Sequence, residues 1–336
     1  MNLSKLGQAL TAREIFDLIQ QELDQVEKKI TAESVASVDA VTAIGQYLQA
    51  SGGKRLRPAL LLLAARLTSP DGASRAAAIE LGAVVELIHA ATLVHDDVID
   101  AAETRRGRPS TNVKWGNHTC VLAGDWLYMQ AFQMALRQRN FQVLELLISL
   151  TQMMVEGELI QLERIGRMDV GEADCMELVD RKTARLFSVC ARLGAVASDA
   201  DANTQERLGE YAWNLGMAFQ LVDDVLDFTA REKTLGKPVG GDLREGKVTL
   251  PLVYALDEAT AGERVLVETI LRQRNYDEVP FSRILKLLEK YRGIERVKER
   301  AQAFTNKARE IISQFPESPC QRGLLSVTDL ITERDH

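Results

Sequence analysis

The sequence predicts an all-α protein, a single large helical-bundle domain that spans residues 1–336. Apolar residues recur at helical spacing along almost the whole chain of 336 residues. No alternating strand pattern of useful length is present, and no stretch rich in Pro, Gly and Ser divides the sequence. A chain of this length that is 46% hydrophobic can bury one large core, so one domain is expected.

The predicted helices follow one another with short breaks. Thr11 and Glu14 have the spacing of a capping box, which opens an amphipathic helix with Ile15, Ile19 and Leu23 on one face. Later helices are predicted at about residues 35–50, 55–68, 73–100, 119–138, 140–165, 173–198 and 204–230, with shorter ones up to 333. Turn residues predict breaks at 69–72 and around 236–246.

One predicted helix is apolar on nearly all sides. The segment from Arg75 to His95 has few polar breaks, which indicates a central helix buried on most of its surface. Asp96 and Asp100 follow directly, so they are expected at the mouth of an apolar interior. This arrangement predicts a central cavity that holds the phosphates of a ligand at its mouth and the hydrocarbon part of the ligand in its interior.

Two Asp-Asp-x-x-Asp motifs carry the strongest chemical signal. Each follows a helical apolar pattern, and helix residues four apart lie nearly one above the other, so each motif brings at least two carboxylates together. These carboxylates repel one another near a helix C-terminus, which favours a bound cation. Oxygen ligands without a Cys or His cluster suit Mg²⁺, which shares its shell with substrate phosphates. The predicted metal ligands are Asp96, Asp97, Asp100, Asp223, Asp224 and Asp227.

Three basic clusters predict the other half of a diphosphate site. The segment 51–58 offers a glycine pair, followed by Lys54 and Arg57 three residues apart on one helical face. Arg105 and Arg106 follow the first Asp motif by a short loop. A glycine-rich loop after the second motif holds Lys237, Asp242 and Lys247. Arg binds phosphate through a two-pronged fork and Lys supplies a mobile point charge.

Composition excludes several classes of protein. The formal net charge of −7 with dispersed basic residues argues against a nucleic-acid partner. The four cysteines are widely spaced without a Cys-x-x-Cys pair, so neither a disulfide framework nor a zinc site is indicated. Residues 1–10 lack an apolar signal core, and the apolar run 59–65 is too short to cross a bilayer. These features predict a cytoplasmic protein.

The chain resembles the trans-isoprenyl diphosphate synthases, and the order and spacing of the shared motifs agree across most of it. The matching residues are Gly52-Gly53-Lys54-Arg55-x-Arg57-Pro58, Asp96-Asp97-x-x-Asp100, Arg105-Arg106-Gly107, Lys182-Thr183-Ala184, Gln220-x-x-Asp223-Asp224-x-x-Asp227 and Gly236-Lys237. The resemblance implies an all-α bundle of the isoprenoid synthase type with a central active-site cavity, usually a homodimer. It also implies elongation of an allylic diphosphate with isopentenyl diphosphate.

The resemblance assigns roles to the matching residues, with about three Mg²⁺ ions per active site when substrate is bound. The implied catalytic residues are Asp96, Asp97, Asp100, Arg105, Lys182, Asp223 and Lys237. The implied substrate-binding residues are Lys54, Arg57, His89, Arg105, Arg106, Lys182, Thr183, Gln220, Lys237 and Lys247. Asp96, Asp100 and Asp223 are expected as direct ligands, and the other three aspartates as direct or water-mediated ones. His89 lies two helical turns before Asp96, on the same face, although a lone His on an apolar helix is also typical of a core.

Product length is predicted from the helix before Asp96. The positions four and five residues upstream are Thr92 and Ala91, both small, whereas short-chain members of the family resemble one another in placing an aromatic residue near this point. This chain is therefore similar to long-chain octaprenyl, solanesyl or decaprenyl synthases. Ala91 is also compatible with plain helix packing. Four bulky residues are candidates for the tunnel floor: Tyr128, Phe132, Phe141 and Met153.

Other functions stay open at this point. A short-chain synthase would share every motif except those that set product length. A terpene cyclase or a head-to-head condensing enzyme would also use Asp-rich sites, but the set of Lys54, Arg57 and His89 implies a second diphosphate pocket that a cyclase does not need. A non-catalytic regulatory subunit would be expected to have lost an Asp motif, and both are intact. Transient membrane contact is expected for product release, and Glu333–His336 are expected to help cover the pocket.

Overall fold

The structure, a computed structural model, describes residues 10–53, 55–229 and 239–332. The N-terminal half contains α1 (Ala12–Asp17), α2 (Gln20–Glu33), α3 (Asp39–Ala50), α4 (Leu56–Thr68), α5 (Arg75–Ile99), β1 (Thr104–Arg105), β2 (Arg108–Pro109), α6 (Thr111–Trp115), α7 (Asn117–Arg137) and α8 (Phe141–Arg164). The C-terminal half contains α9 (Glu172–Val179), η2 (Asp180–Ala184), α10 (Arg185–Ala197), α11 (Ala202–Thr229), α13 (Gly241–Arg244), α14 (Leu250–Glu258), α15 (Ala261–Gln273), α16 (Phe281–Lys290), α17 (Gly293–Ser313) and α18 (Pro319–Thr332). The prediction of a single all-α bundle is confirmed.

Local sequence signals explain where several helices begin. The Thr11 side chain accepts from the Glu14 N–H, and the Glu14 carboxylate accepts from the Thr11 N–H, so the predicted capping box is confirmed. Asn140 caps α8 in a similar way by accepting from the N–H of Gln142. The first predicted helix is divided, because the chain turns between α1 and α2 at Leu18 and Ile19.

Two local features differ from the sequence prediction. The helix predicted at 173–198 is interrupted by η2, a π-helical turn between α9 and α10. A short antiparallel hairpin of β1 and β2 follows the first Asp motif. Its turn residues Arg106 and Gly107 have φ values of 54° and 72°, as the two central residues of a type I′ turn require. Strands of two residues are too short to produce a detectable alternating pattern.

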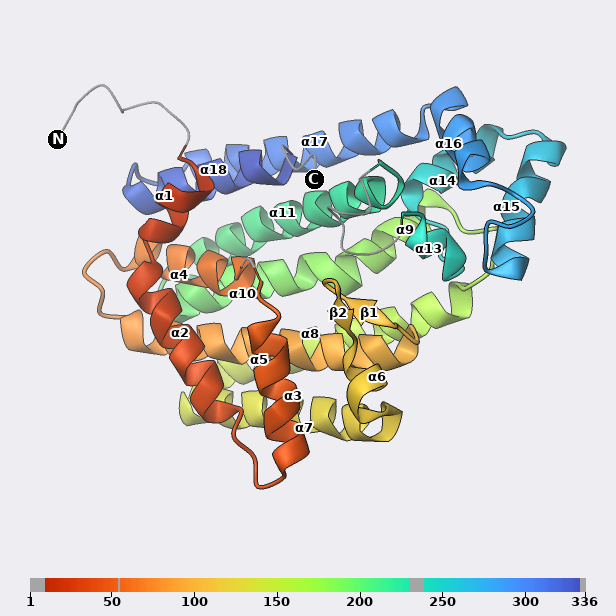
Figure 1. The fold of residues 1–336 in the computed structure, drawn as a ribbon. Coiled ribbons are helices and arrows are strands. Elements are labelled where there is room, and N and C mark those ends of the chain that lie inside the picture. Colours follow the sequence, from red (N-terminus) through yellow and green to blue (C-terminus); the bar gives the residue numbers. More distant parts are fainter. Residues whose placement is uncertain (1–9, 54, 230–238, 333–336) are drawn as a thin grey trace.

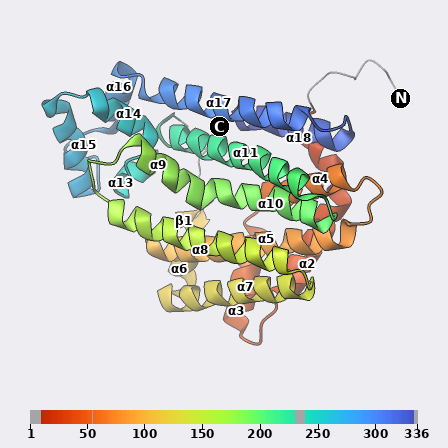
Figure 2. The same ribbon diagram turned by 180° about the vertical axis from the view of Figure 1, so that it is seen from behind.

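The long helices lie roughly parallel and form layers across the molecule (Figure 1). From top to bottom in that view, α17 and α18 cover α11, which lies on α10, and α5 and α8 follow with α7 below. The view from behind shows the same order (Figure 2). Close approach between α4 and α10 depends on Gly194, since a Cβ there would lie 2.3 Å from the Leu61 carbonyl oxygen. The helices around the core therefore pack directly against one another.

Helix α5 occupies the centre of this bundle, as predicted. Its Val84, Leu87 and Ile88 side chains are at most 1% exposed. Among the described residues, α5 alone is long and apolar enough to cross a membrane, but 67% of its most apolar window is buried inside the molecule. It is thus a core helix that ends at the first Asp motif, and α11 ends at the second on the same side of the molecule (Figure 1).

Candidate active site

A cavity of about 1040 Å³ lies beside the ends of α5 and α11. Twelve of the residues predicted from the sequence line it: Arg57, His89, Thr92, Asp96, Asp100, Arg105, Arg106, Lys182, Thr183, Gln220, Asp224 and Lys247. Four other predicted residues are described but lie off this lining: Ala91, Asp97, Asp223 and Asp227. Lys54 and Lys237 lie outside the described residues, as do Glu333–His336. The cavity therefore gathers cationic and acidic groups from distant parts of the chain.

Much of the apolar part of the cavity wall comes from α5, α7 and α8, and residues such as Leu178 on α9 and Leu186 on α10 add to it. The large side chains from α5, α7 and α8 include Ile99, Val121, Tyr128, Met154, Val155, Leu159 and Leu162. Of the four residues predicted as a tunnel floor, Tyr128 is on this lining, whereas the Phe141 side chain is 81% exposed on the outer surface. Phe132 and Met153 are not on the lining. A cavity with phosphate-binding groups and an extended apolar wall suits an amphiphilic ligand.

Asp96 and Asp100 face the cavity from the end of α5. Burial raises the pKa of Asp96 to about 6, and the nearby carboxylates of Glu158 and Asp100 add to this effect while Lys182 opposes it. The Lys247 Nζ donates to Asp100 at 3.0 Å and to Glu245 at 2.7 Å. Burial alone would lower the pKa of Lys247, but these carboxylates hold it above its usual value. The carboxylates thus already attract a cation in the absence of metal.

Asp97 has a different environment from its two neighbours in the motif. Its carboxylate is 0% exposed. The Oδ1 atom accepts from Arg105 Nε at 2.6 Å, and Oδ2 accepts from the N–H and hydroxyl of Thr111 at 2.9 and 2.8 Å. All three donors belong to the segment that follows the motif, so Asp97 is directed away from the large cavity.

The second motif lies on the last turns of α11. Burial holds the pKa of Asp224 well above its usual value, and Asp242 adds to the shift. The Gln220 Nε2 donates to Asp224 at 2.9 Å, and the Thr183 hydroxyl donates to the Gln220 Oε1 at 2.8 Å. Asp227 is 1% exposed and accepts from the Asp242 N–H at 3.2 Å, which fixes the loop after the motif. Asp223 is half-buried.

A third group of residues forms the basic side of the cavity. Arg57 lies over the Phe187 ring, 5.6 Å from its centre, and its Nε has no partner among the described residues. Burial lowers the pKa of Arg57, and Glu86 opposes that shift. Burial and the positive charge of Arg57 and Arg106 hold the pKa of His89 well below its usual value, so its imidazole is neutral. Arg57 lines the cavity, so its guanidinium can face an anionic ligand there.

Sequence reasoning missed Glu86 and Glu158, and it gave no role to Arg55, although Arg55 belongs to a matching motif. Arg55 is paired with Glu27 and lies 3.3 Å from the Glu86 carboxylate. Glu158 pairs with Lys182 at 2.5 Å inside the cavity. Met154 and Gln161 share the face of α8 that carries Glu158, and all three line the cavity, but the sequence alone does not distinguish this face from a solvent-facing one.

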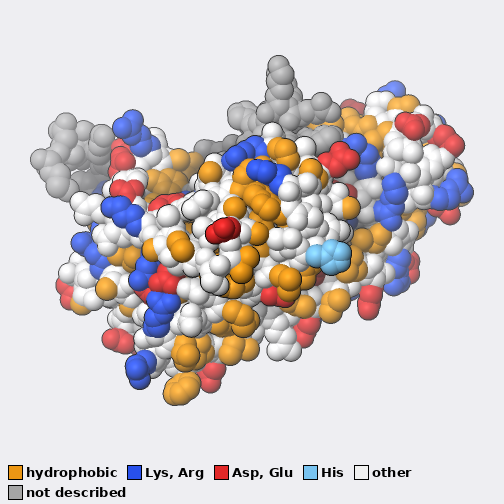
Figure 3. All heavy atoms as spheres, turned by 60° about the horizontal axis from the view of Figure 1, so that its bottom comes forward, with side chains coloured by type: hydrophobic (Ala, Val, Ile, Leu, Met, Phe, Trp, Pro, Cys, Tyr) orange, Lys and Arg blue, Asp and Glu red, His pale blue; other side chains and the backbone are white. Residues whose placement is uncertain are grey.

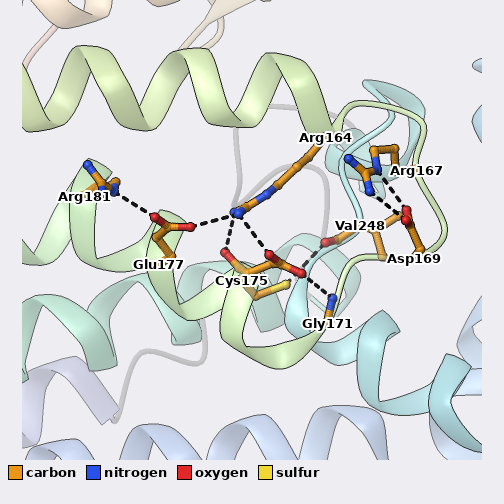
Figure 4. A network of polar contacts seen from close by, with 9 residues as sticks. Arg164, Arg167, Asp169, Gly171, Cys175, Glu177, Arg181 and Val248 are labelled. Atoms are coloured by element: carbon orange, nitrogen blue, oxygen red, sulfur yellow. Dashed lines mark hydrogen bonds and ion pairs between the residues drawn. The ribbon is translucent and has the colours of Figure 1, made fainter.

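The π-helical turn η2 carries Lys182 and Thr183 into the cavity. Gly157 permits the approach of α8, since a Cβ there would lie 2.9 Å from the Arg181 Cβ. Arg181 pairs with Glu177 at 3.2 Å, and Arg164 pairs with Glu177 at 2.8 Å (Figure 4). Figure 4 shows these groups as a chain of ion pairs between the end of α8 and α9. Because π turns are rare and concentrate at functional sites, we interpret this turn as a functional part of the cavity.

Within the described residues, no three Asp, Glu, His or Cys side chains converge closely enough to hold a metal by themselves. This arrangement still fits Mg²⁺, which is usually bound through one or two carboxylates together with substrate phosphates. The half-buried Asp96, with its raised pKa, and the Lys247 amine held on Asp100 both indicate a surplus of negative charge that a divalent cation would balance.

The fold and the site define an all-α isoprenoid synthase. The family model described as polyprenyl synthetase matches residues 38–288, and the chain belongs to this family. It is therefore a trans-prenyltransferase, and the resemblance inferred from its motifs is confirmed.

The chain is similar over nearly its full length to characterised relatives. It is 35% identical to the octaprenyl diphosphate synthase of Haemophilus influenzae over 323 residues, which cover 96% of this chain and 97% of that protein. It is 34% identical to the geranylgeranyl diphosphate synthase of Saccharolobus solfataricus over 279 residues, which cover 81% of this chain and 83% of that protein. Long-chain and short-chain synthases thus both occur among its relatives.

Two solved structures share the fold closely. The polyprenyl synthase from Caulobacter crescentus CB15, complexed with calcium and isoprenyl diphosphate, superposes with a TM-score of 0.92 at 33% identity and covers 98% of this chain and 99% of its own. The decaprenyl diphosphate synthase from Rhodobacter capsulatus gives a TM-score of 0.90 at 31% identity, covering 97% of this chain and 100% of its own.

Proposed function

We propose that this chain adds successive isopentenyl diphosphate units to an allylic diphosphate and makes an all-trans polyprenyl diphosphate of about eight to ten isoprene units, roughly C40 to C50. The observation that carries this proposal is the apolar cavity wall beside the first Asp motif, where Thr92 lines the cavity and no aromatic residue stands at position 91 or 92. A product of this length suits the side chain of a lipid quinone. The whole chain, residues 1–336, acts as one polyprenyl synthase domain.

The two diphosphates occupy different parts of the cavity wall. Asp96, Asp100 and Asp223, supported by Asp224 and Asp227, hold the allylic diphosphate through about three Mg²⁺ ions. The calcium and isoprenyl diphosphate bound to the Caulobacter crescentus relative support a divalent metal and this class of ligand. Residues that contact the allylic diphosphate directly are Arg105, Lys182, Thr183, Gln220 and Lys247, with Lys237 outside the described residues.

Isopentenyl diphosphate binds to the basic side formed by Arg57, His89 and Arg106, together with Lys54 outside the described residues. The Arg57 guanidinium, which lines the cavity, gives this diphosphate a cationic donor. The neutral imidazole of His89 can donate a hydrogen bond without adding charge. The second diphosphate pocket favours elongation over cyclisation, since a cyclase acts on one diphosphate.

The chemistry needs charge stabilisation rather than a side-chain nucleophile. When bound, Mg²⁺ supplies positive charge against the oxygens of the departing pyrophosphate. Arg105, Lys182 and Lys247 donate hydrogen bonds to the negative charge that develops as the allylic C–O bond breaks. The double bond of isopentenyl diphosphate then forms the new C–C bond, and the proton lost from it passes to pyrophosphate. The apolar wall excludes water from the cation.

A short-chain product is the alternative, because geranylgeranyl diphosphate synthases are also relatives. Tyr128 is the bulky residue that would end such a short tunnel, since it lines the cavity and its ring lies 5.9 Å from that of His95. One assay distinguishes a long-chain or short-chain synthase from a non-catalytic subunit and from a cyclase. A synthase releases pyrophosphate only when Mg²⁺, an allylic diphosphate and isopentenyl diphosphate are all present, whereas a cyclase does not need isopentenyl diphosphate.

A homodimer is the assembly that best fits the outer surface of α7 and α8. Exposed apolar side chains recur every seven residues on both helices, which is the spacing of a helix–helix seam. These seam residues are Leu122, Met129 and Leu136 on α7, and Phe141, Ile148, Val155 and Leu162 on α8, each 43–81% exposed. The underside of the molecule shows hydrophobic side chains across its middle, with acidic and histidine side chains among them (Figure 3).

The size of this seam suits a second copy of the chain. The helices have 21 and 24 residues, so a two-helix face is about 30 Å long and about 20 Å wide. Its area approaches the roughly 800 Å² per partner of a standard stable interface. Val155 and Leu162 belong both to the seam and to the cavity wall, so a partner copy would also cover one side of the cavity.

Placing a carboxylate in the seam should break the dimer. We expect the Met129→Glu variant to sediment near the chain mass of 37.3 kDa and the unchanged protein near twice that mass, because a charge buried at an apolar interface is costly. Val265→Glu is the matched control, since Val265 is a 54% exposed apolar residue on α15, outside the seam. Analytical ultracentrifugation provides the measurement. A dimeric Met129→Glu variant would exclude this seam as the interface.

The protein acts in the cytoplasm, where its water-soluble substrates are available, and meets a membrane transiently when the apolar product leaves. No nucleic acid takes part, in keeping with the net charge of −7.

A further inference from the structure

Tyr47, near the end of α3, contacts the segment that follows the first Asp motif. Its hydroxyl donates to the carbonyl of Pro109 on β2 at 2.7 Å. The Arg108 guanidinium lies 4.3 Å and the Lys114 Nζ 3.9 Å from the centre of the Tyr47 ring, as in cation–π contacts. The Trp115 ring packs edge-on against the same ring, with 5.2 Å between the ring centres. One side chain of α3 therefore holds both β2 and α6.

The end of α3 also leads directly into the basic segment that precedes α4. Ser51 is the last capping residue of α3, and its hydroxyl oxygen accepts from Arg108 at 3.2 Å. A Cβ at Gly53 would lie 3.3 Å from a terminal nitrogen of Arg106, so this guanidinium lies against the backbone of the segment. Arg57 follows on α4. The basic side of the cavity is thus assembled from two segments, one with Arg57 and one with Arg106, which meet beside α3.

The side chain of Arg106 depends on these contacts more than that of Arg105 does. Arg105 is held by the buried Asp97 carboxylate at 2.6 Å. The Arg106 side chain makes no hydrogen bond or ion pair within the part of the chain that the structure describes. It lines both the large cavity and a separate space of about 20 Å³ that Tyr47 also lines. Where the Arg106 guanidinium stands in the cavity is therefore determined by how the hairpin is held against α3.

We propose that Tyr47 is a positioning residue for isopentenyl diphosphate, because it fixes Arg106 at the distance from Arg57 that one diphosphate group requires. The inference rests on the function proposed above, which assigns both arginines to that substrate. A guanidinium forms two parallel hydrogen bonds to phosphate only when its plane is correctly oriented. Tyr47 lies off the lining of the large cavity, so it acts through Arg106 and does not touch the ligand.

The test compares two tyrosines with similar contacts in the full-length protein. The Tyr291 hydroxyl, at the end of α16, donates to Glu263 at 2.8 Å, and Lys290 lies 4.7 Å from the ring centre, but Tyr291 is not on the cavity lining. Steady-state elongation with Mg²⁺ gives separate KM values for isopentenyl diphosphate and farnesyl diphosphate. Tyr47→Leu should raise KM for isopentenyl diphosphate about tenfold, with kcat and KM for farnesyl diphosphate within about twofold. Tyr291→Leu should leave both KM values within about twofold.

Equal rises in the two KM values of Tyr47→Leu, or an unchanged KM for isopentenyl diphosphate, would overturn the proposal. If Tyr47→Leu fails to fold, Tyr47→Phe keeps the ring and loses only the hydrogen bond to Pro109. It should raise KM for isopentenyl diphosphate about threefold, and an unchanged value would overturn the proposal.

A double-variant cycle tests whether Tyr47 acts through Arg106. Arg106→Gln alone should raise KM for isopentenyl diphosphate, and adding Tyr47→Leu should raise it little further, because both changes remove the same contact with the ligand. Independent effects that multiply would contradict the proposal. An unchanged protein that incorporated no isopentenyl diphosphate would contradict the proposed function, and this inference with it. Normal elongation with the same KM values in the unchanged protein and in Tyr47→Leu would overturn the inference alone.

Discussion

Replacing Asp96 by asparagine is expected to lower kcat/KM for elongation by about 10² to 10³-fold or more. The substitution keeps the shape of the side chain but removes the negative charge that faces the cavity beside Asp100 and Glu158. Steady-state release of pyrophosphate with Mg²⁺, an allylic diphosphate and isopentenyl diphosphate provides the measurement.

A measurement of thermal stability distinguishes this loss of function from misfolding. Burial raises the pKa of Asp96 from 3.8 to about 6, so the folded metal-free protein binds its proton more tightly than the unfolded chain. The ionised Asp96 therefore reduces stability as pH rises from 3.8 through 6. Asp96→Asn should have an equal or higher Tm at pH 7 without metal, and this difference should vanish below about pH 4.

The control for this prediction is Asp257→Asn, an exposed aspartate on α14. It should leave kcat/KM within about twofold, since surface substitutions away from a site have small effects. Full activity of the Asp96→Asn protein would contradict the assignment of Asp96 to the metal site.

Replacing Thr92 by phenylalanine is expected to shorten the product to about three or four isoprene units. Thr92 lines the cavity one helical turn before Asp96, so a ring there would take up space in the cavity that Val155 and Leu159 of α8 also line. Mass spectrometry of the dephosphorylated products gives the chain length directly. Thr92→Ala should keep long products and serves as the control for loss of the hydroxyl.

Ala91→Phe, the substitution suggested by the sequence alone, provides an informative comparison. Ala91 is 0% exposed and lies off the cavity lining. A ring at this position must either displace core side chains, at a cost of about 1–3 kcal/mol, or enter the cavity. We expect it to shorten the product as well, but with a lower Tm than Thr92→Phe. Unchanged long products from both variants would show that the chain grows along another path.

The sequence was sufficient to predict the long helices and most of the polar residues that line the candidate cavity. Apolar periodicity gave the long helices, because a buried helical face repeats regardless of its partner. The central position of α5 followed from its lack of polar breaks, and the gathering of Arg57, Lys182 and Lys247 at one cavity followed from the motifs. These features are local patterns or matches to a family, so tertiary packing was not needed to detect them.

Features created by tertiary packing were not predictable. The π turn at Lys182 occurs where α8 approaches at Gly157, and no local pattern marks it. Glu158 could not be distinguished from a solvent-facing residue of α8 until its contact with Lys182 was known. In the motif, Asp97 looks equivalent to Asp96. The fold of residues 102–111 makes them different: Asp97 is buried and hydrogen-bonded by this segment, whereas Asp96 faces the cavity.

The most direct test of the central claim is the length of the product made by the purified protein with Mg²⁺, farnesyl diphosphate and excess isopentenyl diphosphate. After dephosphorylation, mass spectrometry should show a ladder that ends at about eight to ten isoprene units, because the cavity has no aromatic residue at Thr92 to stop the growing chain. A product that stops at geranylgeranyl diphosphate would contradict the long-chain assignment and indicate a floor at Tyr128. The absence of any elongation would contradict the proposed activity itself.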